Sequence, residues 1–425
     1  MFKAFVNAFK IPDLRTKLLF TLAIIGVYRI GSWIPVPGVD VDLLRNAVAS
    51  GAAAGIIGVI NLFSGGALTA MAIFALGIMP YITASIIMQL LAVVIPRLEQ
   101  LQKEGEQGRR KITQYSRYTT VVLALLQSTA MTVLAGNGTL FGQDVLRDDA
   151  VGTKLLIVLT LTAGTSMIMW LGELITQRGV GNGMSLIIYI SIISQVPSQG
   201  SLVLTSNGGG ALTMIIVMGA LLTIAVVFME QGQRRVPVQY ARRQVGRRVY
   251  GGQSTYIPLK VNTAGVIPVI FASSLMYLPQ LASQIANWPW LTDFTNRYLL
   301  DASSWVYIAV FAALTIFFAY FYTAIAFNPI EVADNMKKYG GFIPGIRPGR
   351  QTAEYLDRVL TRITLPGSLY LAIVAVIPFI ALAVANIQAF PLGGVSLLIM
   401  VGVSLETMKQ VESQLMMRNY EGFLT

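Results

Sequence analysis

Long uninterrupted runs of apolar residues dominate the hydrophobic pattern of the chain. The stretch from Ala70 to Ile95, for example, contains no charged side chain, and about 20 apolar residues are enough for a helix to cross a bilayer. Similar runs recur along the sequence, so the pattern predicts an all-α polytopic membrane protein with ten transmembrane helices. The predicted spans are Leu18–Ile34, Ala70–Ile95, Tyr118–Ala135, Lys154–Ile175, Met184–Val196, Ala211–Glu230, Ile257–Ile285, Trp305–Phe327, Leu365–Ile387 and Gly393–Met408.

The composition agrees with a membrane protein and excludes most enzyme classes. Of the 425 residues, 55% are hydrophobic and 12% are charged, whereas soluble domains carry about 25% charged residues. The absence of cysteine and histidine excludes disulfides, thiol nucleophiles, most zinc sites and Ser–His or Cys–His catalysis. The chain also lacks a Gly-x4-Gly-Lys phosphate-binding motif. We therefore expect no enzymatic activity, no catalytic residues, no metal and no cofactor.

The distribution of basic residues orients the predicted spans. If the N-terminus is cytoplasmic, all but five of the 31 Lys and Arg residues fall on the cytoplasmic side. Cytoplasmic loops of bacterial membrane proteins usually carry such an excess of Lys and Arg. We therefore expect both termini in the cytoplasm and the basic amphipathic segment Met1–Lys17 on the membrane surface. The five exceptions are Arg29, inside the first span, and Arg45, Arg147, Lys154 and Arg297.

An uncharged segment rich in Ser and Gly, residues 197–210, separates the fifth predicted span from the sixth. We predict that it is an external hinge loop between an N-terminal half, residues 1–196, and a C-terminal half, residues 211–425. Because each half contains five spans, the two halves enter the membrane in opposite directions, as in an inverted repeat.

The segment Ala53–Leu68 does not fit a simple helical bundle. Its apolar part is too short to span a bilayer and ends in Ser64-Gly65-Gly66. One interpretation is a re-entrant half-helix in a central cavity, because non-helical backbone at membrane depth requires burial in protein or access to water. The alternative is an interfacial helix on the outer surface, and the residues alone leave both open.

Two predicted cytoplasmic loops, residues 231–256 and 328–362, are longer and more basic than orientation requires. In both loops aromatic and β-branched residues alternate with Arg and Lys. The basic residues either set the topology alone or form a docking surface for an acidic partner.

Six segments in sequence order resemble the SecY family, the channel subunits of the bacterial Sec translocon. They are LFSGGAL at Leu62–Leu68, IFALGIMPYITASIIMQLL at Ile73–Leu91, LGELITQRGVGNGMSLIIY at Leu171–Tyr189, RRVPVQYARR at Arg234–Arg243, KVNTAGVIPVIFASS at Lys260–Ser274 and GFIPGIRPG at Gly341–Gly349. The resemblance implies a protein-conducting channel in the bacterial cytoplasmic membrane. Unfolded preproteins would cross it, and hydrophobic segments would leave sideways into lipid.

The resemblance also implies residue roles. An apolar pore ring would consist of Ile78, Ile82, Met184, Ile188, Ile270 and Ile399. Ile78 and Ile82, like Met184 and Ile188, are four residues apart and therefore share a helix face. A plug of about residues 55–66 would include Gly55, Ile56, Ile57, Gly58, Val59, Ile60, Asn61, Leu62, Phe63 and Ser64. An apolar ring seals by dewetting yet accepts a chain of any sequence.

Further roles concern the lateral gate and the partners. The gate would include Pro80, Thr83, Ser85, Gln127, Gly265, Pro268, Ser273 and Ser274, and partner docking would use Arg234, Arg235, Arg242, Arg243, Arg347 and Arg350. The implied partners are the small membrane subunits SecE and SecG, the motor ATPase SecA, the ribosome with its RNA, preproteins with their signal peptides, and membrane lipid.

Two other classes of function remain in view. A small-solute transporter would explain inverted halves but requires a charged or polar site at mid-membrane, and the predicted spans contain no obvious one. A membrane-embedded transferase would need converging nucleophiles or metal ligands, for which the composition leaves few candidates.

Overall fold

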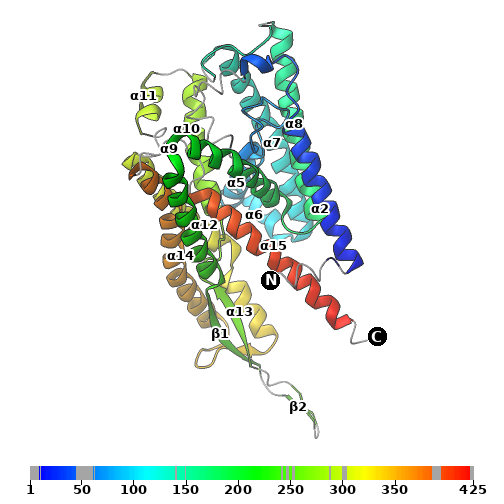
Figure 1. Cartoon of the computed structure of the whole chain (residues 1–425). Coiled ribbons are helices and arrows are strands. Elements are labelled where there is room, and N and C mark those ends of the chain that lie inside the picture. Colours follow the sequence, from blue (N-terminus) through cyan, green and yellow to red (C-terminus); the bar gives the residue numbers. More distant parts are fainter. Residues whose placement is uncertain are drawn as a thin grey trace.

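A computed structural model describes residues 9, 11–44, 61, 63–138, 141–148, 150–240, 243–245, 248–250, 254–286, 289–298, 304–384 and 394–421. Helices make up most of this part of the chain (Figure 1). They are α2 (Pro12–Gly31), α5 (Met79–Val94), α6 (Pro96–Lys103), α7 (Glu106–Gly136), α8 (Val151–Arg178), α9 (Gly183–Gln231), α10 (Ile267–Ala286), α11 (Pro289–Tyr298), α12 (Trp305–Ala326), α13 (Pro329–Lys338), α14 (Arg350–Val384) and α15 (Gly394–Glu421).

The prediction of an all-α protein is corrected by a small sheet at the end of the molecule drawn lowest in Figure 1. The sheet has the order β4-β1-β5, with antiparallel pairing throughout. The alternating pattern along β1 is typical of a strand with one buried face, because the side chains of Val236 and Val238 are buried and their neighbours are exposed. The strands are β1 (Gln233–Tyr240), β2 (Arg243–Val245), β3 (Arg248–Tyr250), β4 (Ser254–Lys260) and β5 (Gly341–Phe342), with β2 and β3 forming a separate pair.

The predicted count of ten spans is not confirmed. Among the described residues, six helices are long and apolar enough to cross a membrane, or seven if the bent pair α5 and α6 counts as one. The two helices of this pair meet at 99°. Helix α2 is not among the six, and it carries Arg15, Lys17 and Arg29 within its 20 residues.

Two predicted spans begin too early. Helix α5 starts at Met79 rather than at Ala70, because the preceding segment is a series of turns with a positive φ of 58° at Gly77. Similarly, α10 starts at Ile267, since residues 257–260 belong to β4. The segment before α5 is mostly buried, whereas Pro258 and Lys260 before α10 are exposed, and apolar composition revealed the backbone conformation of neither segment.

The predicted hinge loop is also corrected. Residues 197–207 continue α9 as helix, and Gly208 interrupts it with a non-helical φ of 78° and ψ of 176°. The hydroxyls of this segment bond to carbonyls of the preceding turn, as Thr205 does to Ser201 at 3.1 Å, so its polar side chains are compatible with helix. Figure 1 shows that α9 changes direction along its length. The division of the chain into two halves remains a proposal.

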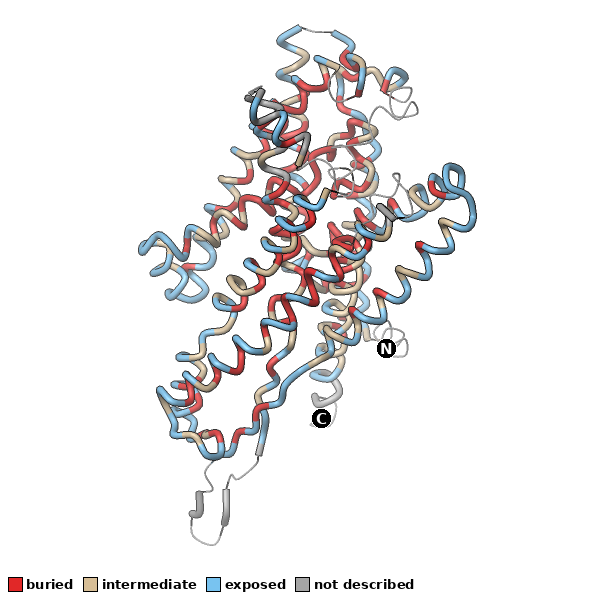
Figure 2. Tube along the Cα trace, turned by 90° about the vertical axis from the view of Figure 1, so that its left-hand side faces the viewer, coloured by how far each residue is buried: buried red, intermediate tan, exposed pale blue. Residues whose placement is uncertain are grey.

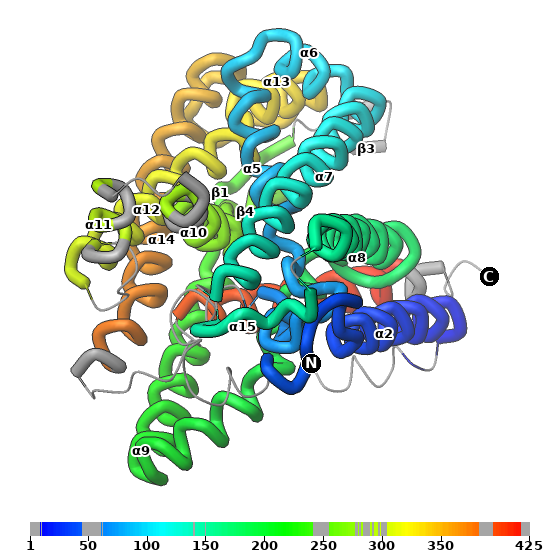
Figure 3. Tube along the Cα trace, turned by 90° about the horizontal axis from the view of Figure 1, so that it is seen from above, coloured from blue at the N-terminus to red at the C-terminus, as the bar shows by residue number. Residues whose placement is uncertain are grey.

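One large apolar cluster forms the core of the helical part (Figure 2). Helix α10 lies at its centre and contacts α5 and α7 on one side and α12 and α14 on the other (Figure 3). A second cluster holds the small sheet against α13 and α14. A third joins the start of α2, through Leu14 and Leu18, to Val411 near the end of α15.

Candidate functional site

The six predicted ring residues meet in the large apolar cluster. Five of them are buried, with exposed fractions between 0% for Ile399 and 7% for Ile82. They come from four elements, namely the start of α5, α9, α10 and α15. The structure therefore brings together residues separated by more than 300 positions, although the cluster alone does not make them a pore. The five are Ile78, Ile82, Ile188, Ile270 and Ile399.

Met184 differs from the other five. It is half-buried, and its sulfur lies against the backbone of α8, since a Cβ added at Gly172 would come within 2.4 Å of Met184 Sδ. The N-cap residue Asn182 fixes this start of α9, because its Oδ1 accepts a hydrogen bond from the Met184 N–H at 3.1 Å. Met184 thus packs between α8 and α9.

Of the predicted plug, only the C-terminal end lies within the described residues. Gly55, Ile56, Ile57, Gly58, Val59, Ile60 and Leu62 fall outside them. We call Asn61 and Phe63–Gly66 the stem. Phe63 and Ser64 are fully buried and, like Asn61, helical, and the helical turn ends at Gly65 and Gly66, both with positive φ.

Side chains of α2 and α9 hold the carbonyl groups of the stem. Tyr28 Oη lies 3.3 Å from the Ser64 carbonyl oxygen and 2.6 Å from Ser191 Oγ. Gln195 Nε2 donates to the Asn61 carbonyl at 2.5 Å. These side-chain donors add to the backbone hydrogen bonds that the same carbonyls accept, from the Gly66 N–H to Asn61 at 3.2 Å and from the Ala67 N–H to Ser64 at 3.4 Å.

Arg29 completes this set of contacts. Its Nη1 donates to the Gly65 carbonyl at 3.0 Å and to Ser194 Oγ at 2.9 Å. Gly65 is needed here, because a Cβ would lie 3.0 Å from the Cα of Ser191 and 3.2 Å from Arg29 Nη1.

The predicted gate residues line contacts between α5, α7 and α10. Pro80, Thr83, Gln127, Pro268 and Ser274 are buried, Ser85 and Ser273 are half-buried, and Gly265 precedes α10 with a φ of 62°. Two of their hydroxyls bond within their own helices: Thr83 donates to the Met79 carbonyl, and Ser273 to the Ile270 carbonyl. Ser274 Oγ has no partner among the described residues.

The neighbouring interface between α7 and α8 differs from the contacts between α5, α7 and α10, which we call the gate seam. Ser128 and Thr162 share a hydrogen bond of 3.0 Å across it. Arg117 Nε and Glu173 Oε1 form an ion pair at 2.7 Å across it as well. Helix α7 is therefore tied to α8 by polar groups, whereas the described gate residues meet α10 through packing.

The two predicted basic loops form one surface rather than two. Pairing of Gln239 with Phe342 and of Tyr240 with Gly341 joins β1 of the first loop to β5 of the second. The predicted docking residues Arg234, Arg235, Arg347 and Arg350 are exposed on this surface. Arg235 lies 4.8 Å above the ring of Tyr256, and Arg350 pairs with Glu354 at 2.9 Å. Arg242 lies outside the described residues, as does the side chain of Arg243.

The strands of this surface connect directly to the gate helix. Glu230, next to the start of β1, accepts a hydrogen bond from Asn262 Nδ2 at 2.5 Å. Asn262 also donates to the Gly265 carbonyl at 3.0 Å, just before α10. Asn262 thus links Glu230, which precedes β1, to Gly265, which precedes α10.

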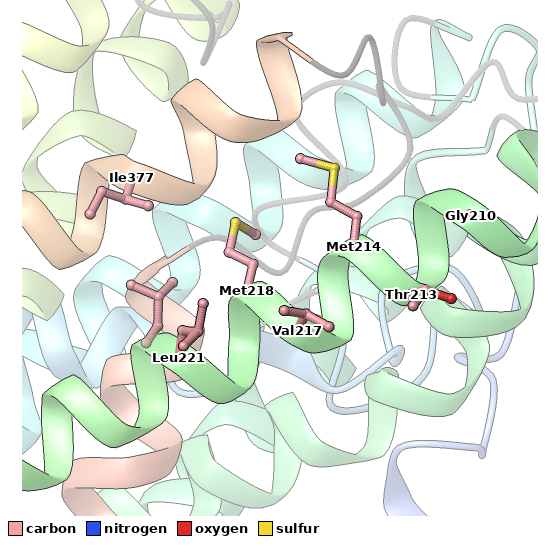
Figure 4. Close-up of a pocket in the computed structure, with 8 residues that line it drawn as sticks. Gly210, Thr213, Met214, Val217, Met218, Leu221 and Ile377 are labelled. Carbon is pink, nitrogen blue, oxygen red and sulfur yellow. The ribbon is translucent and has the colours of Figure 1, made fainter.

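An apolar pocket of about 670 Å³ lies between α9 and α14 (Figure 4). The pocket is lined mainly by apolar side chains, among them Met214, Met218 and Ile377, and Thr213 is the polar side chain in its lining. No predicted ring, plug, gate or docking residue lines it. Without a set of converging polar groups it has no means of fixing a defined substrate.

Sequence reasoning missed the contacts around the stem. Tyr28, Ser191, Ser194 and Gln195 were not assigned a role, and Arg29 was noted only as an exception to the charge pattern. A signal existed: the three α9 residues are polar positions at helical spacing within an apolar run, and therefore share one face.

The SecY family model matches residues 72–408 of the chain. Relatives named protein translocase subunit SecY are 53% identical over 440 residues in Mycobacterium tuberculosis and 58% identical over 443 residues in Streptomyces coelicolor, with full coverage of both chains in each case. The chain belongs to the SecY family. It is accordingly a multi-pass membrane protein of a protein translocase family and not an enzyme.

Solved structures show the same fold at low sequence identity. A protein-conducting channel matches with a TM-score of 0.66 and 18% identity, covering 96% of each chain. Sec61 from the canine ribosome-channel complex matches with a TM-score of 0.62 and 17% identity, also over 96% of each chain. Identities this low support the SecY fold rather than the residue roles.

Proposed function

We propose that this SecY-family chain is the protein-conducting channel of a bacterial Sec translocon. The convergence of Ile78, Ile82, Ile188, Ile270 and Ile399 in one buried cluster carries the proposal. As a constriction, these side chains exclude water when they meet and separate around a translocating chain without requiring specific hydrogen bonds. Met184 also belongs to the proposed ring, but its packing on Gly172 gives it less support than the other five.

Closure in the resting state involves the proposed plug, about residues 55–66, whose stem lies next to this cluster. Phe63 belongs to the same cluster as the ring residues. The tight contact between Gly77 and the stem supports this closure, because a Cβ at Gly77 would lie 2.9 Å from the Phe63 carbonyl oxygen and Gly77 directly precedes Ile78. A plug held here would lie against the first ring residue.

The lateral gate is the seam between α5, α7 and α10, with α12 behind it. The described gate hydroxyls of Thr83 and Ser273 bond within their own helices, which supports this role, because an apolar contact between helices has little advantage over contact with lipid. A segment in the channel then leaves when its residues favour lipid. Leu or Ile contributes about −0.3 to −0.6 kcal/mol, and Arg at the centre costs about 2.5 to 3.5 kcal/mol.

The driving force comes from partners at the basic surface, in our proposal SecA or a ribosome. The exposed Arg234, Arg235, Arg347 and Arg350 suit an acidic partner. The positive-inside distribution of Lys and Arg supports a cytoplasmic location for this surface and for both termini. SecE and SecG are the proposed small subunits, and preproteins with signal peptides are the proposed substrates.

Reconstitution tests this function. The chain would be incorporated into vesicles with its small subunits and supplied with SecA, ATP and a preprotein. We expect the preprotein to become protected from added protease in a time-dependent way, and to remain accessible in vesicles without the chain. Equal protection in both preparations would contradict the proposal.

A further inference from the structure

Arg29 occupies a position where two helical segments end. It lies in the last turn of α2, and its Nη1 donates to the carbonyl of Gly65, directly after the helical turn of the stem. The C-terminal end of a helix carries a partial negative charge. The half-buried guanidinium lies in the last turn of α2 and donates to the carbonyl that follows the stem turn, so its positive charge is favourable at this place.

The hydrogen bonds of Arg29 reach beyond its own helix. They go to Gly65 O of the stem and to Ser194 Oγ of α9, and Ser194 lies 3.4 Å from the same Gly65 carbonyl. In the part of the chain that the structure describes, Arg29 forms no ion pair with a carboxylate. A cation that served only to cap α2 would not need these two acceptors.

We propose that Arg29 is a positioning residue that anchors the stem and thereby sets the resting equilibrium of the channel between closed and open states. The inference rests on the proposed function, in which the plug closes the channel. Arg29 does not line the proposed ring and acts only through the stem.

All the groups that hold the stem come from α2 and α9, on one side of the gate seam. Tyr28 and Arg29 belong to α2, while Ser191, Ser194 and Gln195 lie in the first part of α9. The turns after the stem are held on this side too, since the Ile73 N–H donates to the Ile34 carbonyl at 2.9 Å. When α10 moves away from α5 and α7, the stem keeps these contacts.

Substitutions at position 29 should change the ratio of open to closed states of the channel. Loss of a hydrogen bond to a charged group shifts an equilibrium by about tenfold or more, and a tenfold change corresponds to about 1.4 kcal/mol. We therefore expect Arg29→Met to raise the ratio of open to closed states about tenfold. Arg29→Lys keeps the cation and is expected to cause a smaller rise.

Single-channel recording of the full chain with its small subunits in planar bilayers provides the test. Lys17→Met is the matched control, because it removes an exposed cation from the same helix and should leave the ratio unchanged. Ser194→Ala keeps Arg29 and removes one of its acceptors, so a rise of about threefold is expected. This second variant gives a result even if Arg29→Met assembles poorly.

A deletion of residues 55–60 separates the anchor from the plug. We expect the deletion to raise the open ratio, and Arg29→Met to add no further rise in the deletion background. If the deletion variant leaks while Arg29→Met and Ser194→Ala leave the ratio of open to closed states unchanged, the anchoring role of Arg29 is rejected and the plug itself is not. Additive effects would also overturn it, since they indicate general loosening of the fold. A deletion variant that stays closed would reject the plug and with it the role of Arg29.

Discussion

Tyr28 and Ser191 lie 163 positions apart in sequence, yet their side-chain oxygens are 2.6 Å apart. Tyr28 is 1% exposed and its ring stacks on Phe74 at a centroid distance of 5.7 Å. Its hydroxyl also lies 3.3 Å from the Ser64 carbonyl oxygen. One side chain therefore ties α2, the stem and α9 together.

Tyr28→Phe is expected to weaken this junction without a cavity, because the ring and its stacking on Phe74 remain. Loss of the hydroxyl leaves Ser191 and Ser64 with one hydrogen bond fewer, and we expect the free energy of unfolding to fall by about 1 kcal/mol. Thermal unfolding in detergent measures the effect. Tyr339→Phe, at a site 78% exposed, is the control. Equal midpoints for both variants would show that the Tyr28 hydroxyl contributes nothing.

Ser274→Ala is expected to stabilise the closed seam. The buried hydroxyl of Ser274 has no partner among the described residues, and an unpaired buried hydroxyl costs about 1 kcal/mol or more. We expect a higher unfolding midpoint and slower export of preproteins with weakly hydrophobic signal peptides. The adjacent Ser273→Ala removes a hydroxyl that is satisfied by the Ile270 carbonyl at 2.9 Å, so it should not stabilise. A lower midpoint for Ser274→Ala would reject this explanation.

The double variant Ile82→Asn with Ile270→Asn is expected to make the resting channel leak ions. Polar amides oppose dewetting of an apolar constriction, and both isoleucines are buried in the same cluster. Conductance in planar bilayers checks the prediction. The pair Ile82→Leu with Ile270→Leu keeps the apolar surface and should stay closed. If the two double variants conduct equally little, these residues do not form the constriction.

Arg347→Glu is expected to lower motor-driven export several-fold and to leave folding intact. Arg347 is exposed, and within the described part of the chain its side chain forms no hydrogen bond or ion pair, so reversing its charge alters the basic surface without disturbing a core. Export into vesicles, together with unfolding in detergent, provides the measurement. Lys338→Glu makes the same charge change at an exposed site on α13. Export that falls equally in both variants would indicate a general charge effect rather than docking at Arg347.

The sequence predicted the membrane class and the helical character because both follow from local properties. Runs of apolar residues long enough to span a bilayer mark α7, α8, α12 and α14 without any knowledge of their neighbours. The resemblance to the SecY family named five isoleucines that the structure then gathers into one cluster. That these residues line a pore remains a prediction.

Features that depend on distant parts of the chain were not predictable in the same way. Residues 197–207 look like a loop by composition, yet the backbone is helical as far as the break at Gly208. The alternation at Val236 and Val238 was visible, but its meaning as a strand depends on partners in β4 and β5. Arg29 stood out by its charge, while its acceptors Gly65 and Ser194 lie 36 and 165 positions away.

Cross-linking along a stalled chain tests the central claim most directly. Photoreactive residues would replace Ile82, Ile188 and Ile270 in the reconstituted channel, with Ile224, an outward-facing residue 67% exposed, as the control. A preprotein would be halted partway through transport. We expect adducts from the three isoleucine positions and none from Ile224, because the substrate passes through one central constriction. Continued transport without adducts at any of the three positions would mean that the path lies elsewhere.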